Sequence, residues 1–293
     1  MAGQLKEVRN RIKSVQSTQQ ITKAMKMVSA AKLRRAQDAI IQMRPYAKKL
    51  QELLSNIVSN NEGGSGMSLA TERPVEKVLF IVLTSDRGLC GAFNSNVIKL
   101  TKTTINEKYA NQFKKGNVTI WNIGKKGYEH FAKMKYNADA TYKDIFLQLS
   151  FENVQQAAQA AMKAFQERQF DVAEIVYSQF KNAATQRFEV ERFLPVPRVE
   201  KKQGATQADF IYDPAKEQLV AELMPKILNT QLYKAVLDSN ASEHGARMTA
   251  MDKASENANE MLRTLKITYN RARQAAITTE LTEIVSGAAV LQG

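Results

Sequence analysis

Residues 16–35 read QSTQQITKAMKMVSAAKLRR and contain the middle of a long coiled-coil seam. Steps of alternately three and four residues, the spacing of a coiled coil, connect this stretch with sequence on both sides of it. The seam comprises Leu5, Val8, Ile12, Val15, Gln19, Thr22, Lys26, Ser29, Leu33, Ala36, Ile40, Met43, Ala47, Leu50, Leu54 and Ile57. Four consecutive positions are polar, so the register continues through a region without the apolar side chains that usually join two helices.

A second seam with the same spacing lies near the other end of the chain. It comprises Met248, Met251, Ser255, Ala258, Leu262, Leu265, Tyr269, Ala272 and Ala276. A first helix of about 55 residues would be about 80 Å long, and such a rod needs a partner helix. The two seams therefore predict an antiparallel coiled coil within the chain. Pro45 removes one backbone hydrogen bond, so we expect a kink or a local break there.

The middle of the chain shows a different pattern. The apolar runs KVLFIVLTS (77–85) and NVTIWNIG (117–124) are typical of buried strands, and a short helix is expected to begin near Lys125. Residues 151–169 have helical spacing, and 170–182 and 185–197 alternate like an edge hairpin, with Asp171 and Glu174 on a solvated strand edge. This order predicts an α/β fold with a partly parallel sheet.

The predicted architecture is a central Rossmann-like α/β domain flanked by long N- and C-terminal helices that form the antiparallel coiled coil. We expect an N-terminal coiled-coil helix at 1–60, a linker at 61–76, an α/β head domain at 77–212 and a C-terminal coiled-coil helix at 213–293.

Charge is concentrated in the first helix. The chain has a net charge of +13, and residues 1–60 alone carry twelve basic and three acidic side chains, whereas residues 215–293 carry nine of each. An excess of positive charge favours a polyanionic or acidic-faced partner. Nucleic acid, an anionic membrane and an acidic protein all fit on charge alone.

Several classes of protein are disfavoured by composition. No window approaches 18 consecutive apolar residues, and the N-terminus lacks the apolar region of a signal peptide, so we expect a globular protein that does not span a membrane. The single cysteine, Cys90, cannot form a disulfide within the chain. Together with two distant histidines, His130 and His244, it does not supply a zinc site.

The sequence TSDRGLCGAFN (84–94) follows a strand, where α/β folds often bind phosphate groups. It contains neither G-x-x-x-x-G-K-[ST] nor G-x-G-x-x-G, so a packed strand-to-helix turn with a buried, structural Cys90 is the better interpretation. No catalytic constellation is evident. We therefore expect no cofactor, no metal and no catalytic activity of the chain itself.

Two other functional classes stay open on these residues alone. A coiled-coil nucleic-acid-binding protein would use the basic first helix on phosphates, although Tyr46 is the only aromatic residue before position 60. An α/β enzyme with a helical dimerisation stalk would need a phosphate-binding loop at 84–96.

Three segments resemble a known family. RNRIKSVQSTQQITKAMKMVSAAKLRRAQ (9–37), TSDRGLCGAFNSN (84–96) and YNRARQAAITTELTEIVSGAA (269–289) are similar to the most distinctive segments of the gamma subunit of rotary (F-type) ATP synthases. The resemblance spans the chain and implies a central rotor shaft without an active site. Its rotation would couple an ion-driven c ring to conformational cycling of the catalytic beta subunits during ATP synthesis, and ATP hydrolysis would drive ion pumping in reverse.

The resemblance also implies partners and contact residues. The partners would be the alpha and beta subunits, the epsilon subunit and the c ring, and not nucleic acid. Contacts with the beta subunits would involve Lys23, Met25, Lys26, Arg273, Gln274, Thr278 and Glu280. A tip turning in an apolar sleeve would contain Ile284, Val285, Ala288 and Ala289. The side facing epsilon and the c ring would contain Phe210, Ile211 and Tyr212.

Near the polar part of the seam, Ile21, Met25 and Val28 form a second apolar face beside it. A rotor section needs different contacts on different sides, which fits this arrangement. The resemblance implies a peripheral position on the cytoplasmic face of the bacterial inner membrane, through the complex and not by insertion. The start at Met1 without a transit peptide favours a bacterial source, and the lone Cys90 means that the thiol switch of photosynthetic members is absent.

Overall fold

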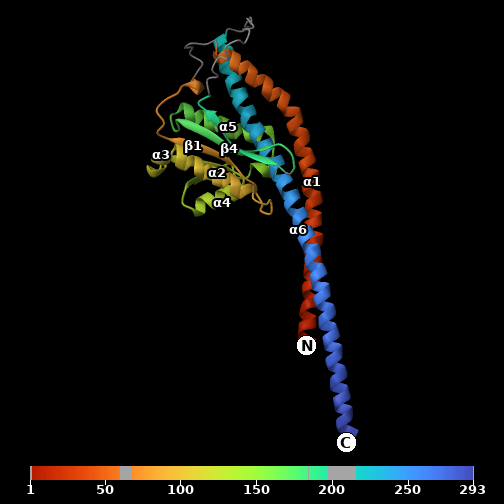
Figure 1. Ribbon diagram of the computed structural model, residues 1–293. Coiled ribbons are helices and arrows are strands. Elements are labelled where there is room, and N and C mark those ends of the chain that lie inside the picture. The colour runs from red at the N-terminus through yellow and green to blue at the C-terminus, as the bar shows by residue number, and fades with distance from the viewer. Residues whose placement is uncertain (1, 60–67, 184, 197–215, 293) are drawn as a thin grey trace. The chain divides into compact units, whose positions relative to one another are not determined.

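The computed structural model describes residues 2–59, 68–183, 185–196 and 216–292 (Figure 1). The chain forms two compact units. One consists of residues 1–29 with residues 248–293, and we call it the helical pair; the other consists of residues 30–247, and we call it the α/β unit. The predicted division into residues 1–60, 61–76, 77–212 and 213–293 stays a prediction about the domains.

The α/β unit contains a five-stranded sheet in the order β3-β2-β1-β4-β5. Its strands are β1 (Val78–Leu83), β2 (Val118–Ile123), β3 (Asn137–Asp139), β4 (Val172–Phe180) and β5 (Gln186–Leu194). Neighbouring strands from β3 to β4 are parallel, and β5 is antiparallel to β4 at the edge. The predicted α/β fold and edge hairpin are confirmed. The sequence analysis missed β3, because three residues are too few to show a strand period.

Side chains of β1 alternate between two apolar cores. Leu79 and Ile81 pack on one face with α5 (Phe151–Gln166) and with buried residues of α6 (Lys216–Gln292) such as Leu232. Phe80 and Val82 pack on the other face with α2 (Phe93–Lys108) and α4 (Lys125–Lys133). Because both faces are covered, β1 is an uninterrupted apolar run, as parallel strands usually are. Shorter helices are α3 (Ala110–Lys114), η1 (Ser68–Ala70) and η2 (Ile145–Gln148).

The expectation that Glu174 lies on a solvated strand edge is wrong. Glu174 is in β4 opposite Phe80 of the central strand and is buried. Its Oε1 accepts a hydrogen bond of 2.8 Å from the Tyr109 hydroxyl, and Arg192 Nη2 lies 3.5 Å away. Burial and the neighbouring carboxylate raise the pKa of Tyr109. Positive side chains on the neighbouring elements compensate the buried charge of Glu174. The alternation of apolar and polar residues along the strand did not reveal that this charge is buried.

Two long helices carry the coiled-coil seams. Helix α1 (Ala2–Ser59) and helix α6 each contain an internal proline, Pro45 and Pro225. The local break considered at Pro45 is not present, since α1 continues through it; the orange part of the ribbon, toward its C-terminal end, curves (Figure 1). A helix tolerates the lost hydrogen bond by bending when packing holds it on both sides.

Replacement of Gly124 by alanine tests the junction between β2 and α4. Gly124 has a φ of +107°, and an added Cβ would overlap the backbone carbonyl of Thr84. We expect G124A to lower the free energy of unfolding by about 3 kcal/mol or more, because both strain and overlap act at once. Urea denaturation followed by the fluorescence of Trp121, the only tryptophan, measures the change.

The matched control is G88A. A Cβ at Gly88 meets nothing within 4 Å, so this variant should change the free energy of unfolding by less than about 1 kcal/mol. Equal effects of the two substitutions would show that the junction is not a tight contact.

Candidate functional site

The seams predicted from the sequence are the contact face of the helical pair. In α1, Thr22 and Ser29 are buried, and the seam positions from Leu5 to Gln19 are half-buried. In α6, Met251, Ser255, Ala258 and Leu262 are buried, and the later seam positions up to Ala276 are half-buried. Contacts between the two helices join higher residue numbers of α1 to lower residue numbers of α6. The two helices are therefore antiparallel, as predicted.

The polar part of the seam in α1 faces polar residues of α6. Gln19 Nε2 donates a hydrogen bond to Asn259 Oδ1. The hydroxyls of Thr22 and Ser255 are 2.7 Å apart, and Lys26 Nζ lies 2.5 Å from Asp252 Oδ1.

The fourth polar position, Ser29, donates a hydrogen bond of 2.8 Å to the carbonyl of Met25 within α1. Buried polar groups cost free energy unless they find partners, and here each position has one. The polar seam is thus a matched set of pairs and not a gap in the packing.

Asp252 and Asn259 were missed by the sequence analysis. Both lie one position beyond a seam residue of α6, Met251 and Ala258, so the three-four spacing does not include them. A polar run in one seam requires polar partners at the facing positions of the other helix. A search of the second helix for such partners could have found both residues.

A second apolar face lies beside the seam. Ile21 is 59% exposed and Val28 is 57% exposed, and between them Met25 is half-buried. Met27 is also exposed. Lys23 is exposed, whereas Lys26 is tied to Asp252 with 41% of its side chain still exposed. The predicted contact residues Lys23, Met25 and Lys26 therefore lie together on one segment, although Lys26 also serves the helical pair.

The C-terminal part of α6 extends beyond α1. Tyr269 accepts a hydrogen bond of 2.8 Å from Arg9 Nη2. In this register the start of α1 at Ala2 falls near Ala276, and α6 continues past this point to Gln292 (Figure 1). Ile284 and Val285 are 68% and 65% exposed.

The other predicted contact residues of this end are placed as follows. Arg273, Gln274, Thr278, Glu280 and Ala288 are exposed on α6. Ala289 is within the helix, but its side chain lies outside the described residues, as do Phe210, Ile211 and Tyr212 altogether. A groove of about 660 Å³ is lined by Leu5, Lys6, Arg9, Ala276, Thr279, Glu280 and Glu283. Of the predicted residues only Glu280 lines this groove.

In the α/β unit, the place where such folds bind ligands is filled by the chain itself. Ligands of doubly wound sheets bind outside the carboxyl ends of the strands where the strand order reverses, here between β1 and β4. Arg247 Nη2 of α6 donates hydrogen bonds of 2.9 and 3.2 Å to the carbonyls of Arg87 and Gly88 after β1. Ser242 Oγ donates one of 3.1 Å to the carbonyl of Ser178 in β4.

A glycine permits this close approach. A Cβ on Gly245 would lie 3.2 Å from the carbonyl oxygen of Ala183 in the loop after β4, so a larger residue would require α6 or this loop to shift by a few tenths of an ångström. Cys90 is buried against Phe93 and Ala246, as the sequence analysis predicted for a structural cysteine. In the loop 84–94, Ser85, Cys90 and Phe93 are buried, whereas Arg87 and Leu89 are exposed.

His244 lies in this filled crevice. Burial, together with the positive charges of Arg247 and Lys32, lowers the pKa of His244 to about 4. Burial raises the pKa of the neighbouring Glu243, although Arg247 Nη1 is 2.5 Å from its Oε1. The crevice therefore holds a neutral imidazole next to an ion pair at neutral pH.

The described residues offer neither a cluster of metal ligands nor a helix that could span a membrane. They contain no group of three or more His, Cys, Asp or Glu side chains arranged to hold a metal ion. Within the same ranges, no helix carries a stretch long and apolar enough to cross a lipid bilayer.

These features define a class of proteins in which an α/β domain is inserted between two terminal helices that pair with each other. A family model described as ATP synthase matches residues 4–291. The ATP synthase gamma chain of Cytophaga hutchinsonii is 53% identical over 290 residues, 98% of each chain. That of Chlorobaculum parvum is 46% identical over 288 residues, 98% of this chain and 99% of the relative. The chain belongs to the ATP synthase gamma chain family, and it is thus a subunit of the complex and not its catalytic subunit.

Solved structures show the same fold at lower identity. A chain from the structure of the Euglena gracilis mitochondrial ATP synthase, OSCP/F1/c-ring in rotational state 3, is 21% identical with a TM-score of 0.68. The match covers 99% of this chain and 95% of that one. A chain from the rotor of the same enzyme in rotational state 1 has a TM-score of 0.63 over 94% of this chain and 100% of that one, also at 21% identity.

A double-mutant cycle between Thr22 and Ser255 tests the polar pairing. We expect T22A and S255A to show a coupling free energy of about 1 kcal/mol, because each removes one side of the same hydrogen bond. Hydrogen exchange of backbone amides in residues 12–29 gives the free energy of opening. The control cycle pairs T22A with T268A, whose exposed hydroxyl bonds only within α6; a coupling as large in the control would contradict a specific pair.

The pH dependence of stability tests the crevice. Because the pKa of His244 is about 4 in the folded chain and near 6.5 when unfolded, the unfolded state binds the proton more tightly. The stabilisation by neutral His244 is complete above pH 6.5 and is lost as the pH falls toward 4, by about 3 kcal/mol. Urea denaturation of the wild type and of H244Q between pH 7.5 and 4.5 measures it. The difference between them should change with pH, and a constant difference would contradict a buried neutral imidazole.

Proposed function

We propose that this chain is the central rotor shaft of an F-type ATP synthase, coupling rotation of an ion-driven c ring to conformational cycling of the catalytic beta subunits. ATP hydrolysis would drive the reverse rotation and ion pumping. Its partners are the alpha and beta subunits around the helical pair, and the epsilon subunit and the c ring at the α/β unit. Membership in the gamma chain family and the likeness to chains of the Euglena gracilis complex support this proposal.

The observation that carries the proposal is the end of α6 beyond α1. Leu281, Ile284 and Val285 are each more than half exposed there. Full burial of such a side chain is worth about 1.5–3 kcal/mol, so a surrounding apolar sleeve would stabilise this segment. Apolar contacts are non-directional, and a smooth apolar tip lets the helix turn without breaking specific bonds. Ala288 and Ala289 complete the proposed tip.

The proposed polar contacts with the beta subunits involve residues outside the tip. We propose that Arg273, Gln274, Thr278 and Glu280 form a polar catch, and that Lys23, Met25 and Lys26 meet acidic segments of the beta subunits. The exposed Lys23 beside the apolar face of Ile21 and Val28 supports this assignment, because charge complementarity guides such contacts. Phe210, Ile211 and Tyr212 are proposed for the side facing epsilon and the c ring.

The proposed location follows from these partners. The chain would be peripheral, on the cytoplasmic face of the bacterial inner membrane, and held there by the complex. In this role the α/β unit is a scaffold, which agrees with a ligand crevice filled by α6.

Reconstitution with alpha and beta subunits tests the proposal. The full chain should enter a stoichiometric complex and raise its steady-state ATPase turnover above that of alpha and beta alone. If it neither enters the complex nor changes turnover, the shaft proposal fails, and salt-dependent binding of the basic helix to nucleic acid becomes the next assay.

A variant of the tip tests the sleeve directly. We expect the double substitution I284D/V285D to lower turnover of the reconstituted complex at least tenfold, because two carboxylates would have to be buried without partners. The matched control is T282A, an exposed residue of the same stretch whose loss should change turnover less than twofold. A turnover of I284D/V285D equal to that of T282A would show that the tip turns in water and not in an apolar sleeve.

A further inference from the structure

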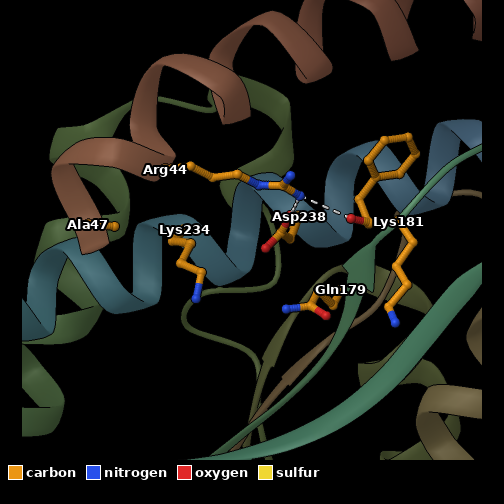
Figure 2. Close-up of a pocket in the computed structure, with 7 residues that line it drawn as sticks. Arg44, Ala47, Gln179, Lys181, Lys234 and Asp238 are labelled. Atoms are coloured by element: carbon orange, nitrogen blue, oxygen red, sulfur yellow. Dashed lines mark hydrogen bonds and ion pairs between the residues drawn. The ribbon is translucent and has the colours of Figure 1, made fainter. Parts of the chain in front are cut away.

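A cavity in the α/β unit has a chemistry that the shaft role does not use. It has a volume of about 540 Å³ and lies between α1, the end of β4 and α6 (Figure 2). Its lining residues are Arg44, Ala47, Gln179, Phe180, Lys181, Lys234 and Asp238. Figure 2 shows the side chains of Arg44, Lys234, Gln179 and Asp238 arranged around one space from three different elements.

Asp238 is a buried carboxylate that is ion-paired with Arg44 and accepts from the Phe180 backbone N–H, but one of its oxygens, Oδ1, has no hydrogen-bond donor in the described part of the chain. Its side chain is 2% exposed, and its Oδ1 has no hydrogen-bond partner among the described residues. The nearest cation, Arg44 Nη2, is 3.7 Å from Oδ1, too far for a hydrogen bond, and donates instead to the Phe180 carbonyl at 3.1 Å. A buried carboxylate oxygen in this state is costly, and a ligand that donates a proton to it would remove that cost.

The other walls of the cavity select an anion. Arg44 and Lys234 bring two positive charges to one buried carboxylate, and Lys181 lies at the rim with its side chain directed away from Asp238. A metal cation would be repelled by this excess of positive charge, and a neutral donor would leave the cations without a counter-charge. The fitting ligand must carry negative oxygens for the cations and also one hydroxyl for Asp238.

We propose that this cavity binds inorganic phosphate as the hydrogenphosphate ion, which keeps one proton at neutral pH. The P–OH group donates to Asp238 Oδ1, and the charged oxygens accept from Arg44 and Lys234. Sulfate has the same shape but no proton at neutral pH, so Asp238 repels it. Burial raises the pKa of Asp238 to about 6, and the carboxyl group is therefore mostly ionised, and able to accept this hydrogen bond, at pH 7.5.

Titration calorimetry of the full chain at pH 7.5 and constant ionic strength tests this site. The probes are inorganic phosphate, the phosphomonoester AMP, and sulfate. We expect inorganic phosphate to bind at least tenfold more tightly than sulfate, and also more tightly than AMP, whose phosphomonoester has lost its second proton at pH 7.5. Sulfate or AMP binding as tightly as inorganic phosphate, or no binding of any probe at 20 mM or below, roughly the range of weak sites, overturns the proposal.

Two variants assign the binding to named groups. K234Q should weaken phosphate binding at least fivefold, because one cation is lost. D238N should reduce the preference for phosphate over sulfate to less than twofold, because the amide no longer repels sulfate. The matched control is K163Q, an exposed lysine of α5 outside the cavity, which should leave both affinities unchanged.

Phosphate binding that K234Q and D238N leave unchanged would place the ion elsewhere and overturn the assignment. The K234Q variant keeps this test decisive if D238N fails to fold, since Lys234 is only half-buried. The outcome is independent of the shaft role, because the reconstitution assay measures turnover of the complex and this titration measures binding to the isolated chain.

Discussion

The hydrogen bond between Thr22 and Ser255 is the constraint on which the helical pair depends. Apolar seams tolerate slippage by a heptad, because one apolar contact resembles the next. A slip of seven residues here would place the Thr22 hydroxyl against Met248 or Leu262 and leave it without its partner. The flanking pairs of Gln19 and Lys26 resist the same slip. The register in turn determines how much of α6 extends beyond α1, and therefore which residues form the exposed apolar end.

The α/β unit shows how a ligand-binding architecture can become a scaffold. Its strand order is that of folds that bind ligands where the order reverses, yet the side chains of Ser242 and Arg247 occupy this position. Gly245 allows α6 to come this close to the residues after β4. Fold alone therefore does not indicate function, and the surfaces and cavities outside the crevice carry the chemistry of this chain.

Elements with a strong periodic pattern of apolar residues were predictable from the sequence, and elements with a weak pattern were not. Both seams and four of the five strands were predicted, since burial on a helix or in a sheet imposes a period on the residues themselves. The short strand β3 was missed because it contributes too few residues, and Glu174 was misplaced because its counter-charges come from α2 and β5. The proposed contact residues rested on resemblance; the structure shows the exposure of those from Lys23 to Lys26 and from Arg273 to Ala288, and their roles stay predictions.

The sequence by itself determined the class of fold, the two coiled-coil seams and the absence of a nucleotide-binding motif after β1, because these depend on the spacing of neighbouring residues. Only the tertiary structure decided which polar groups face Gln19, Thr22 and Lys26, what fills the crevice of the sheet, and that Arg44 and Asp238 share a cavity. The facing residues of α1 and α6 lie 194 or more positions apart along the chain, and the residues hydrogen-bonded across the crevice lie 64 or more apart. Their meeting depends on how the helices and the sheet pack, and no local pattern records it.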